Sequence, residues 1–370
     1  MRTPKTEITY GDGWTFSGQP GWAVNSIWDV LISRLFANGF DPLAHFFIHF
    51  IAPYPANSIA ENFAWTDLAE CVESNKGKHM YLVFDAHTEA PCFRNVEHAA
   101  VHANSQFGIG YERMILWGGS ADTSGPIRVI QNLNAFTLVT DRSLLSEIKE
   151  PSHHFAMLAR VPKPHRVATA VEVLKRGLDT YGYMSCGSAG LGDDPDLYRR
   201  TVPEPYKDRF PLLLDGLVPS HQQNDVLVLP QVTEAFCQLI PETSYEWLYP
   251  GWSTVFPTEK SEKCFLLGQV PIFVAPAGHV DNLRQLGFDL FDDIIDHSYD
   301  NELDPDARIP LAVDQLEQIC RHVLDQLKQW RTANLHRLRH NRDLCDQLKI
   351  GFWEVAFDRF SSALVMDHLK

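Results

Sequence analysis

Residues 155–188 read "FAMLARVPKPHRVATAVEVLKRGLDTYGYMSCGS", and the order of patterns within them indicates the fold class. An apolar run ends at Arg160, and a short loop bracketed by Pro162 and Pro164 follows it. Apolar side chains then recur at the spacing of an amphipathic helix, at Val167, Ala170, Val171, Leu174 and Leu178. A strand followed directly by such a helix is the repeating unit of parallel α/β sheets.

The rest of the chain carries further runs of this kind, nearly continuous in apolar residues. Such strands are typical of sheets that are covered on both faces. The expected strands are "MYLVFDAHTEA" from Met80, "MILWGGSADTSG" from Met114, "AFTLVTD" from Ala135, "DVLVLP" from Asp225 and "PIFVAPAG" from Pro271. An apolar stripe from Leu316 to Trp330 predicts a long helix near the C-terminus. Strands alternating with helices predict an α/β protein with doubly wound sheets.

The length of 370 residues suggests two domains of ordinary size. Hydrophobic residues make up 45% and charged residues 21%, as in globular proteins. We expect two Rossmann-like domains that face a cleft, residues 1–150 and 151–310. The closing helices, residues 311–370, are expected to pack on these domains.

The net charge of -15 repels phosphate backbones and anionic lipid, so nucleic acid is disfavoured as a partner. The densest basic stretch, "LHRLRHNR" at residues 335–342, is interpreted as a solvated helix face. The seven cysteines are dispersed without a CxxC pair, which indicates reduced, mostly buried thiols.

No segment of the sequence has the length and apolar character of a membrane span. The N-terminal "MRTPKTEITYGDGW" lacks the apolar core of a signal peptide, and "FFIHFIAPY" is short and contains His49. We therefore expect a cytoplasmic protein with no membrane span.

The segment "FPTEK", residues 256–260, opens an expected helix and allows two interpretations. In the first, Thr258 is an N-cap, and Glu259 favours the helix dipole and stands four residues before Lys263. In the second, Glu259 accepts hydrogen bonds from two ribose hydroxyls, and Lys260 contacts a phosphate as a point charge.

A second polar group, Lys163, His165 and Arg166, begins the helix after the 155–160 strand. Cations at a helix N-terminus oppose the helix dipole, and a bound anion would remove this conflict. In open α/β sheets, such a helix start is also where diphosphates bind. A surface charge without a ligand is the alternative interpretation of these residues.

The strings "ARVPKPHR…GLDTYGYMS" and "FPTEKSEKCFLLGQVPIFVAPAGHVDNLRQLGFDLFDDIIDHSYDN" resemble the donor half of glycosyltransferases found in phages, large viruses and bacteria. Their "TEK" segment is similar to that of α-1,3-fucosyltransferases, which have a two-domain GT-B fold. The resemblance covers roughly residues 150–310, and in the N-terminal half it depends mainly on "FDAHTEA". It implies a GT-B-like chain with an N-terminal acceptor domain and a C-terminal domain that binds a nucleotide sugar.

The resemblance also implies roles for single residues. Glu259 would hold the ribose, Lys260 the phosphate, and either Arg166 or Arg160 the diphosphate. Phe256 stands where the fucosyltransferase motif often has an aromatic residue, but it lacks the hydroxyl of a tyrosine. We add Lys163, His165 and Thr258 to this donor-binding set. In the "IDHSYD" string, Asp296, Ser298, Tyr299 and Asp300 are interpreted as a capped turn that closes the domain.

Enzymes of this kind do not hold the diphosphate through a metal, so the resemblance implies no cofactor beside a GDP- or UDP-linked sugar. The strings "DDPD" at 193–196 and "DPD" at 304–306 are interpreted as turns. The pairs His45/His49 and His98/His102 lack the glutamate of a HExxH motif. We therefore predict no metal site.

Inverting sugar transfer requires a general base that takes the proton of the acceptor hydroxyl. The string "FDAHTEA" offers Asp85, His87 and Glu89; Glu89 is the first candidate and Asp85 the second, with helix capping as the alternative. The string "WGGSADTSG", residues 117–125, is expected to be a flexible glycine loop that shapes the acceptor site.

Together these observations predict a metal-independent, inverting glycosyltransferase that moves a hexosyl or pentosyl group to a glycan or another hydroxyl. A modified DNA base is also permitted as acceptor, although the net charge disfavours it. A viral enzyme of this kind would work in the host cytoplasm. Two alternatives stay open: a non-catalytic protein with a GT-B-like fold that binds nucleotides or glycans, and a viral structural protein.

Overall fold

The computed structural model describes the greater part of the C-terminal half and selected elements of the N-terminal half. The described residues are 45–51, 73, 79–86, 92–118, 121–124, 126–131, 147–159, 162–187, 202–212, 230–243, 245, 253–255 and 257–348. The contacts divide the chain into two compact units, each built from separate stretches of sequence, whereas the predicted domains are continuous. The first unit comprises Met1–Asn132, Trp247–Thr254 and Gly351–Lys370, and the second Leu133–Glu246 and Val255–Ile350.

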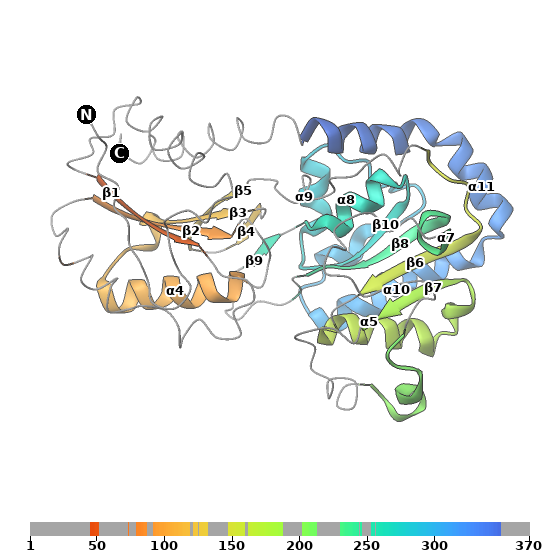
Figure 1. Ribbon diagram of the computed structural model, residues 1–370, viewed down its shortest axis with the longest axis horizontal. Coiled ribbons are helices and arrows are strands. Elements are labelled where there is room, and N and C mark those ends of the chain that lie inside the picture. Colours follow the sequence, from red (N-terminus) through yellow and green to blue (C-terminus); the bar gives the residue numbers. More distant parts are fainter. Residues whose placement is uncertain are drawn as a thin grey trace, which may run out of the picture. The chain divides into compact units, whose positions relative to one another are not determined.

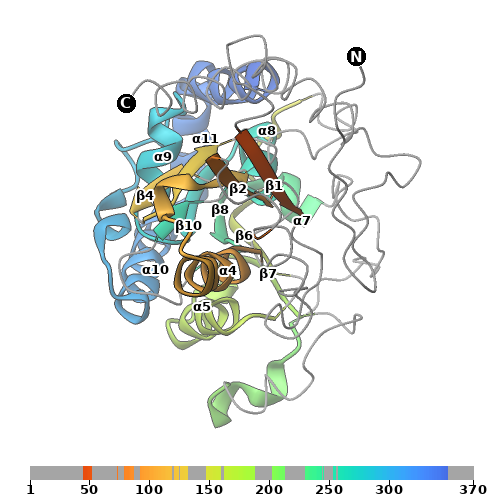
Figure 2. The same cartoon turned by 90° about the vertical axis from the view of Figure 1, so that its left-hand side faces the viewer.

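The first unit contains a four-stranded parallel sheet in the order β1-β2-β3-β5. Its strands are β1 (His45–Ile51), β2 (His79–Ala86), β3 (Met114–Gly118) and β5 (Arg128–Gln131). Helix α4 (Cys92–Phe107) and the short 3-10 helix Tyr111–Arg113 connect β2 to β3, and α4 runs along one face of the sheet (Figure 1, Figure 2). The strands predicted from Met80 and Met114 are confirmed.

The expected glycine loop at 117–125 is wrong for part of its length. Residues Ala121–Ser124 form strand β4, which pairs with β9 (Ser253–Val255) in a two-stranded sheet. The small and polar side chains of "ADTS" do not form an apolar run, and the strand is defined by its pairing with β9. It was therefore not predicted from the sequence.

The second unit contains a four-stranded parallel sheet in the order β10-β8-β6-β7. Its strands are β6 (His153–Ala159), β7 (Gly182–Cys186), β8 (Ala235–Pro241) and β10 (Val270–Val274). From β6 the chain passes to β7 on one side and then to β8 and β10 on the other. The direction in which successive strands are added to the sheet therefore reverses between β6 and β8.

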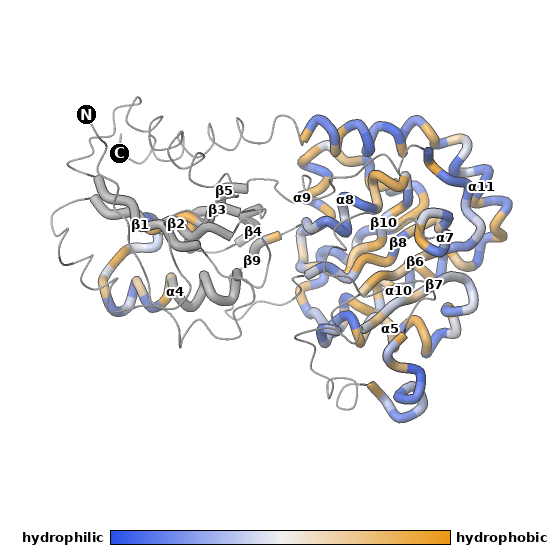
Figure 3. The backbone as a smooth tube through the Cα atoms, viewed as in Figure 1, coloured by the Kyte–Doolittle hydropathy of each residue, from blue (hydrophilic) through white to orange (hydrophobic). Residues whose placement is uncertain are grey.

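Helices cover both faces of this sheet, as Figure 1 shows. Helices α5 (Pro164–Lys175) and α10 (Pro305–Arg321) pack on one face, and α8 (Glu259–Leu266) and α11 (Leu324–Ala333) pack on the other. All residues of β8 and β10 are buried, and the strands appear apolar in Figure 3. Further elements of this unit are α7 (Pro230–Thr233), α9 (His279–Gln285), the 3-10 helices Leu178–Thr180, Glu204–Arg209 and His297–Asn301, and helical residues 335–348.

Several predicted elements of this unit are confirmed and one is wrong. Helix α5 buries Val167, Ala170, Val171 and Leu174 as expected. The stripe from Leu316 to Trp330 is not one helix, because α10 ends at Arg321 and α11 begins at Leu324. Val323 between them is extended, and its N–H donates to Gln326 Oε1 at 3.2 Å, which starts the second helix.

Two further expected strands have no counterpart in the described residues. The string "AFTLVTD" and most of "DVLVLP" lie outside them, and Pro230, the last residue of "DVLVLP", begins α7. Five described cysteines are free and buried, in agreement with the expected reduced thiols: Cys186, Cys237, Cys264, Cys320 and Cys345.

The described residues thus form a mixed α/β protein with two parallel sheets. The GT-B arrangement and the cleft stay predictions. None of the helices in the described ranges combines the length and the apolar character of a membrane span.

Candidate functional site

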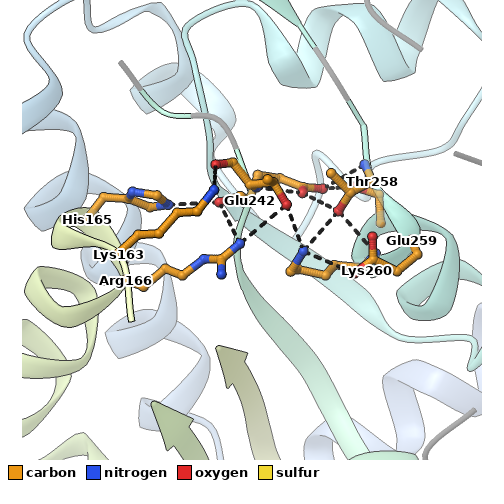
Figure 4. Close-up of polar contacts among 9 residues, drawn as sticks. Lys163, His165, Arg166, Glu242, Thr258, Glu259 and Lys260 are labelled. Carbon is orange, nitrogen blue, oxygen red and sulfur yellow. Dashed lines mark hydrogen bonds and ion pairs between the residues drawn. The ribbon is translucent and has the colours of Figure 1, made fainter. Parts of the chain in front are cut away.

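A polar cluster lies at the carboxyl edge of the second sheet, where the strand order reverses. Lys163, His165 and Arg166 follow β6, while Glu242 and Thr243 follow β8. Neighbouring parallel strands end at the same edge, and ligands of open α/β sheets bind at such a reversal point. Figure 4 shows Glu242 between two groups of side chains, one from the start of α5 and one from the start of α8.

The start of α8 is capped as the first interpretation of "TEK" expected. Thr258 is the N-cap, and its Oγ1 accepts the main-chain N–H of Lys260 at 3.3 Å. Helix capping is therefore confirmed, and it leaves the side chains of Glu259 and Lys260 available for other contacts. Both side chains are only partly buried, with 16% and 17% of their surface exposed.

Glu259 and Lys260 form an ion pair, with Nζ 3.2 Å from Oε1. Burial opposes the ionisation of Glu259, but the charges of Lys260 and Lys263 outweigh it and lower the pKa of Glu259 to about 2. Glu259 is thus an ionised acceptor at neutral pH. The ammonium of Lys260 also donates to the hydroxyls of Thr243 at 3.0 Å and Thr258 at 3.3 Å.

Glu242 is the fully buried centre of the cluster, with none of its surface exposed. Its Oε1 accepts the main-chain N–H of Thr258 at 3.3 Å and the hydroxyl of Ser261 at 2.5 Å. Its Oε2 accepts the hydroxyl of Thr258 at 2.5 Å and the main-chain N–H of Thr243 at 3.2 Å. Each carboxylate oxygen therefore faces two donors, which suits an ionised carboxylate because it only accepts hydrogen bonds.

The start of α5 approaches the same point from the other side. The ammonium of Lys163 donates to the carbonyl oxygen of Thr243 at 2.8 Å. The guanidinium of Arg166 donates through Nη2 to the carbonyl oxygen of Glu242 at 3.4 Å and to the hydroxyl of Thr243 at 3.3 Å. The Thr243 hydroxyl oxygen is therefore shared by Arg166 and Lys260, two cations from different segments.

His165 is a neutral member of this group. Its burial, and then the charge of Arg166, hold the pKa of the imidazole well below its usual range. Its Nε2 lies 2.8 Å from the carbonyl oxygen of Glu242, which can only accept, so Nε2 carries the proton. The ring stacks on Tyr245 with 4.9 Å between centroids.

The cluster carries an excess of positive charge. Four cations lie here, since Lys163, Arg166 and Lys260 donate to Thr243 and Lys263 stands close to Glu259. Three carboxylates accompany them, those of Glu242, Glu259 and Glu262, the last a buried residue in the first turn of α8. This local sign is opposite to that of the chain, whose net charge is -15. An anion is the ligand type that such a place attracts.

His279, the first residue of helix α9 after β10, is a second buried imidazole near Glu242. Burial lowers its pKa to about 4, although the charge of Glu242 acts in the opposite direction. Its ring lies against Phe273, with centroids 4.7 Å apart, and neither ring nitrogen has a hydrogen-bond partner among the described residues. It is therefore neutral at neutral pH.

The structure thus brings together six of the predicted donor-binding residues: Lys163, His165, Arg166, Thr258, Glu259 and Lys260. Arg160, Phe256 and Glu89 lie outside the described residues, as does His87. Asp85 belongs to β2, but its side chain is not described. The identity of the base and the choice between Arg160 and Arg166 therefore stay predictions.

Sequence reasoning missed Glu242 and His279. Glu242 follows β8 directly, and a polar residue at the end of a parallel strand is a usable signal once the strand is recognised. Strand β8 reads "AFCQLIP", and its Gln238 interrupts the apolar run, so it was not among the expected strands.

The "IDHSYD" string is a capped turn, as expected. Asp296 accepts the N–H of Ser298 at 2.9 Å, and Asp300 accepts the N–H of Val280 at 3.1 Å. The hydroxyl of Tyr299 accepts the N–H of Phe273 at 2.9 Å.

The two Asp-x-Asp strings differ in what the structure describes. Asp304 of "DPD" is the N-cap of α10 and accepts the N–H of Asp306 at 3.0 Å, and Pro305 and Asp306 are the first residues of that helix. The string therefore begins a helix, and its interpretation as a turn is wrong. The string "DDPD" lies outside the described residues.

The histidine pairs have different environments. His45 and His49 lie on a strand, β1, where residues four apart are about 13 Å from each other, whereas His98 and His102 lie on α4. Within the described ranges, no group of three or more His, Cys, Asp or Glu residues is arranged to hold a metal ion.

Comparison of the chain with protein-family models, with curated proteins and with solved structures finds no match. The similarity to the glycosyltransferases named above therefore depends on the quoted motifs alone.

Proposed function

We propose that this chain is a metal-independent glycosyltransferase whose second unit binds the nucleoside diphosphate part of a nucleotide sugar. One observation carries the proposal: Arg166 and Lys260 both donate hydrogen bonds to the hydroxyl oxygen of Thr243. This oxygen lies near the ends of β6 and β8, between which the strand order of the sheet reverses. Two cations that share one oxygen can take a phosphoryl oxygen in the same way.

Different residues of the site would contact the ribose and the diphosphate. Glu259 is ionised and partly exposed, so its carboxylate can accept hydrogen bonds from two ribose hydroxyls. Lys163, Arg166 and Lys260 supply positive charge to the diphosphate. The N-terminus of α8 adds main-chain N–H groups and the positive end of the helix dipole.

These groups suit a reaction in which the diphosphate leaves. The oxygen of the acceptor hydroxyl bonds to the anomeric carbon, and the bond between that carbon and the diphosphate oxygen breaks. The diphosphate keeps the electron pair of the broken bond, and Arg166 and Lys260 stabilise the charge that develops on it. The proton of the acceptor hydroxyl passes to a general base, for which Glu89 and Asp85 are the candidates.

A panel of GDP, UDP, CDP, ADP and dTDP, each with Mg²⁺ or with EDTA, tests the proposal by thermal unfolding. A ligand at a hundred times its dissociation constant stabilises the fold by about 2.7 kcal/mol. We expect one nucleoside diphosphate to raise the melting temperature equally with and without Mg²⁺. Stabilisation that requires Mg²⁺ would contradict the metal-independent mechanism, and the absence of any stabilisation would contradict the function.

Turnover is measured separately with the nucleotide sugar that corresponds to the stabilising nucleotide. Release of the free sugar or its transfer to an added glycan supports an enzyme. Tight binding with neither product would favour the alternative of a binding protein without catalysis.

A further inference from the structure

We propose that Glu242 is the positioning residue of this site, because it fixes the first turns of α5 and α8 relative to each other so that their side chains can bind the ligand. This inference rests on the proposed function. Glu242 joins segments that are distant along the chain: its side chain contacts Thr258 and Ser261, and its carbonyl oxygen contacts His165 and Arg166. The two polar groups of the site therefore meet through one residue.

The hydrogen bonds of Glu242 require a carboxylate and not merely a polar side chain. Oε1 faces the main-chain N–H of Thr258, and Oε2 faces the main-chain N–H of Thr243. A hydroxyl can turn to become an acceptor, but a main-chain N–H can only donate. A glutamine at this position would place its NH₂ group against one of the two N–H groups in either orientation of the amide.

Glu242 also offsets repulsion within the site. Lys163, Arg166 and Lys260 converge on Thr243, the neighbour of Glu242 in the chain. Holding three cations together is unfavourable unless negative charge lies nearby, and the buried carboxylate supplies it. Glu242 thus keeps the cations in place before a ligand arrives.

Glu242 acts through its neighbours, since no part of its surface is exposed. The hydroxyl of Thr258 connects it to Lys260, because this hydroxyl donates to Glu242 and accepts from the Lys260 ammonium. Thr243 connects it to Arg166 in the same way, through its N–H and its hydroxyl. Loss of the Glu242 carboxylate should therefore displace both cations.

The test compares wild type, Glu242→Gln, Glu242→Asp and the control Asp289→Asn, whose carboxylate pairs with Arg337 outside this network. Calorimetry measures binding of inorganic pyrophosphate and of GDP and UDP, at a temperature where near-UV circular dichroism shows each protein to be folded. We expect Glu242→Gln to weaken binding at least tenfold per folded molecule. Glu242→Asp, which keeps the charge, should recover part of this loss, and Asp289→Asn should bind like wild type.

Different results overturn different proposals. Wild-type affinity in folded Glu242→Gln would overturn the positioning role and leave the proposed function intact. Failure of the wild type to bind pyrophosphate or any of the five nucleotides of the thermal panel would overturn the proposed function and this inference with it. If Glu242→Gln does not fold, Thr258→Val replaces it, because this change removes the hydroxyl link and keeps Glu242. An unchanged affinity of Thr258→Val would also overturn the positioning role.

Discussion

The hydroxyl of Thr258 donates a hydrogen bond of 2.5 Å to the carboxylate of Glu242, and this contact joins the end of β8 to the first turn of α8. The same hydroxyl oxygen accepts the N–H of Lys260 as an N-cap. Helix capping and the proposed ligand binding would therefore use the same arrangement. The cap fixes the first turn of the helix, and that turn carries Glu259 and Lys260.

Lys260→Met should weaken the binding of a nucleoside diphosphate at least tenfold. The change keeps a long side chain and removes the charge that lies closest to Glu259 and the Thr243 hydroxyl. Calorimetric titration with GDP and UDP measures the effect. Lys175→Met is a matched control, because Lys175 is half-exposed and pairs with Glu172 on α5. Equal losses in both variants would mean that Lys260 has no specific contact with the ligand.

Glu259→Gln should separate the ribose contact from the phosphate contact. The change breaks the ion pair of 3.2 Å and releases the Lys260 ammonium for a phosphate. We expect inorganic pyrophosphate to bind as tightly as in wild type or more tightly, and a nucleoside diphosphate to bind more weakly, because the ribose loses a charged acceptor. A parallel loss for both ligands, measured by titration, would contradict the assignment of Glu259 to the ribose.

His279→Met should reduce the loss of stability in acid. The pKa of His279 is lowered to about 4, whereas a histidine in the unfolded chain has a pKa of about 6.5. The folded state therefore binds fewer protons in this interval, and its stabilisation is present above pH 6.5 and is lost as the pH falls to 4. From pH 7 to pH 5, the free energy of unfolding should fall by about 2 kcal/mol more in wild type than in the variant.

Urea unfolding at the two pH values measures this difference. The acidic groups titrate in both proteins, including Asp300, whose pKa is raised to about 6 by burial, so their effects cancel in the comparison. An identical fall in both proteins would show that His279 becomes protonated in the folded state without cost.

Tyr299→Phe should destabilise the second unit without changing its affinity for the nucleotide. The buried hydroxyl of Tyr299 accepts the N–H of Phe273 at 2.9 Å, and its removal leaves this N–H without that acceptor. The expected loss is about 1–3 kcal/mol in the free energy of unfolding, measured with urea. Tyr181→Phe, at a position that is 41% exposed, is the control and should change stability little. Weaker nucleotide binding in folded Tyr299→Phe would show that the turn also supports the site.

Features that depend on near neighbours along the chain could be predicted from the sequence. The α/β class, the strands from Met80, Met114 and Pro271, and the capped start of α8 are of this kind. The apolar periodicity of a strand or helix, and an N-cap beside its helix, are both local properties. The interpretation of "IDHSYD" as a capped turn was correct for the same reason.

The centre of the site depended on tertiary structure. Glu242 makes its contacts with residues 16 to 77 positions away in the chain, except for the adjacent N–H of Thr243. No local pattern marks such a residue, because its role arises only when the ends of β6 and β8 meet at one edge of the sheet. The sequence alone determined which residues carry the charges and hydrogen-bonding groups that we propose for a phosphate and a ribose. Only the packing of parallel strands decided that they surround one buried carboxylate, since that packing brings distant segments within hydrogen-bonding distance.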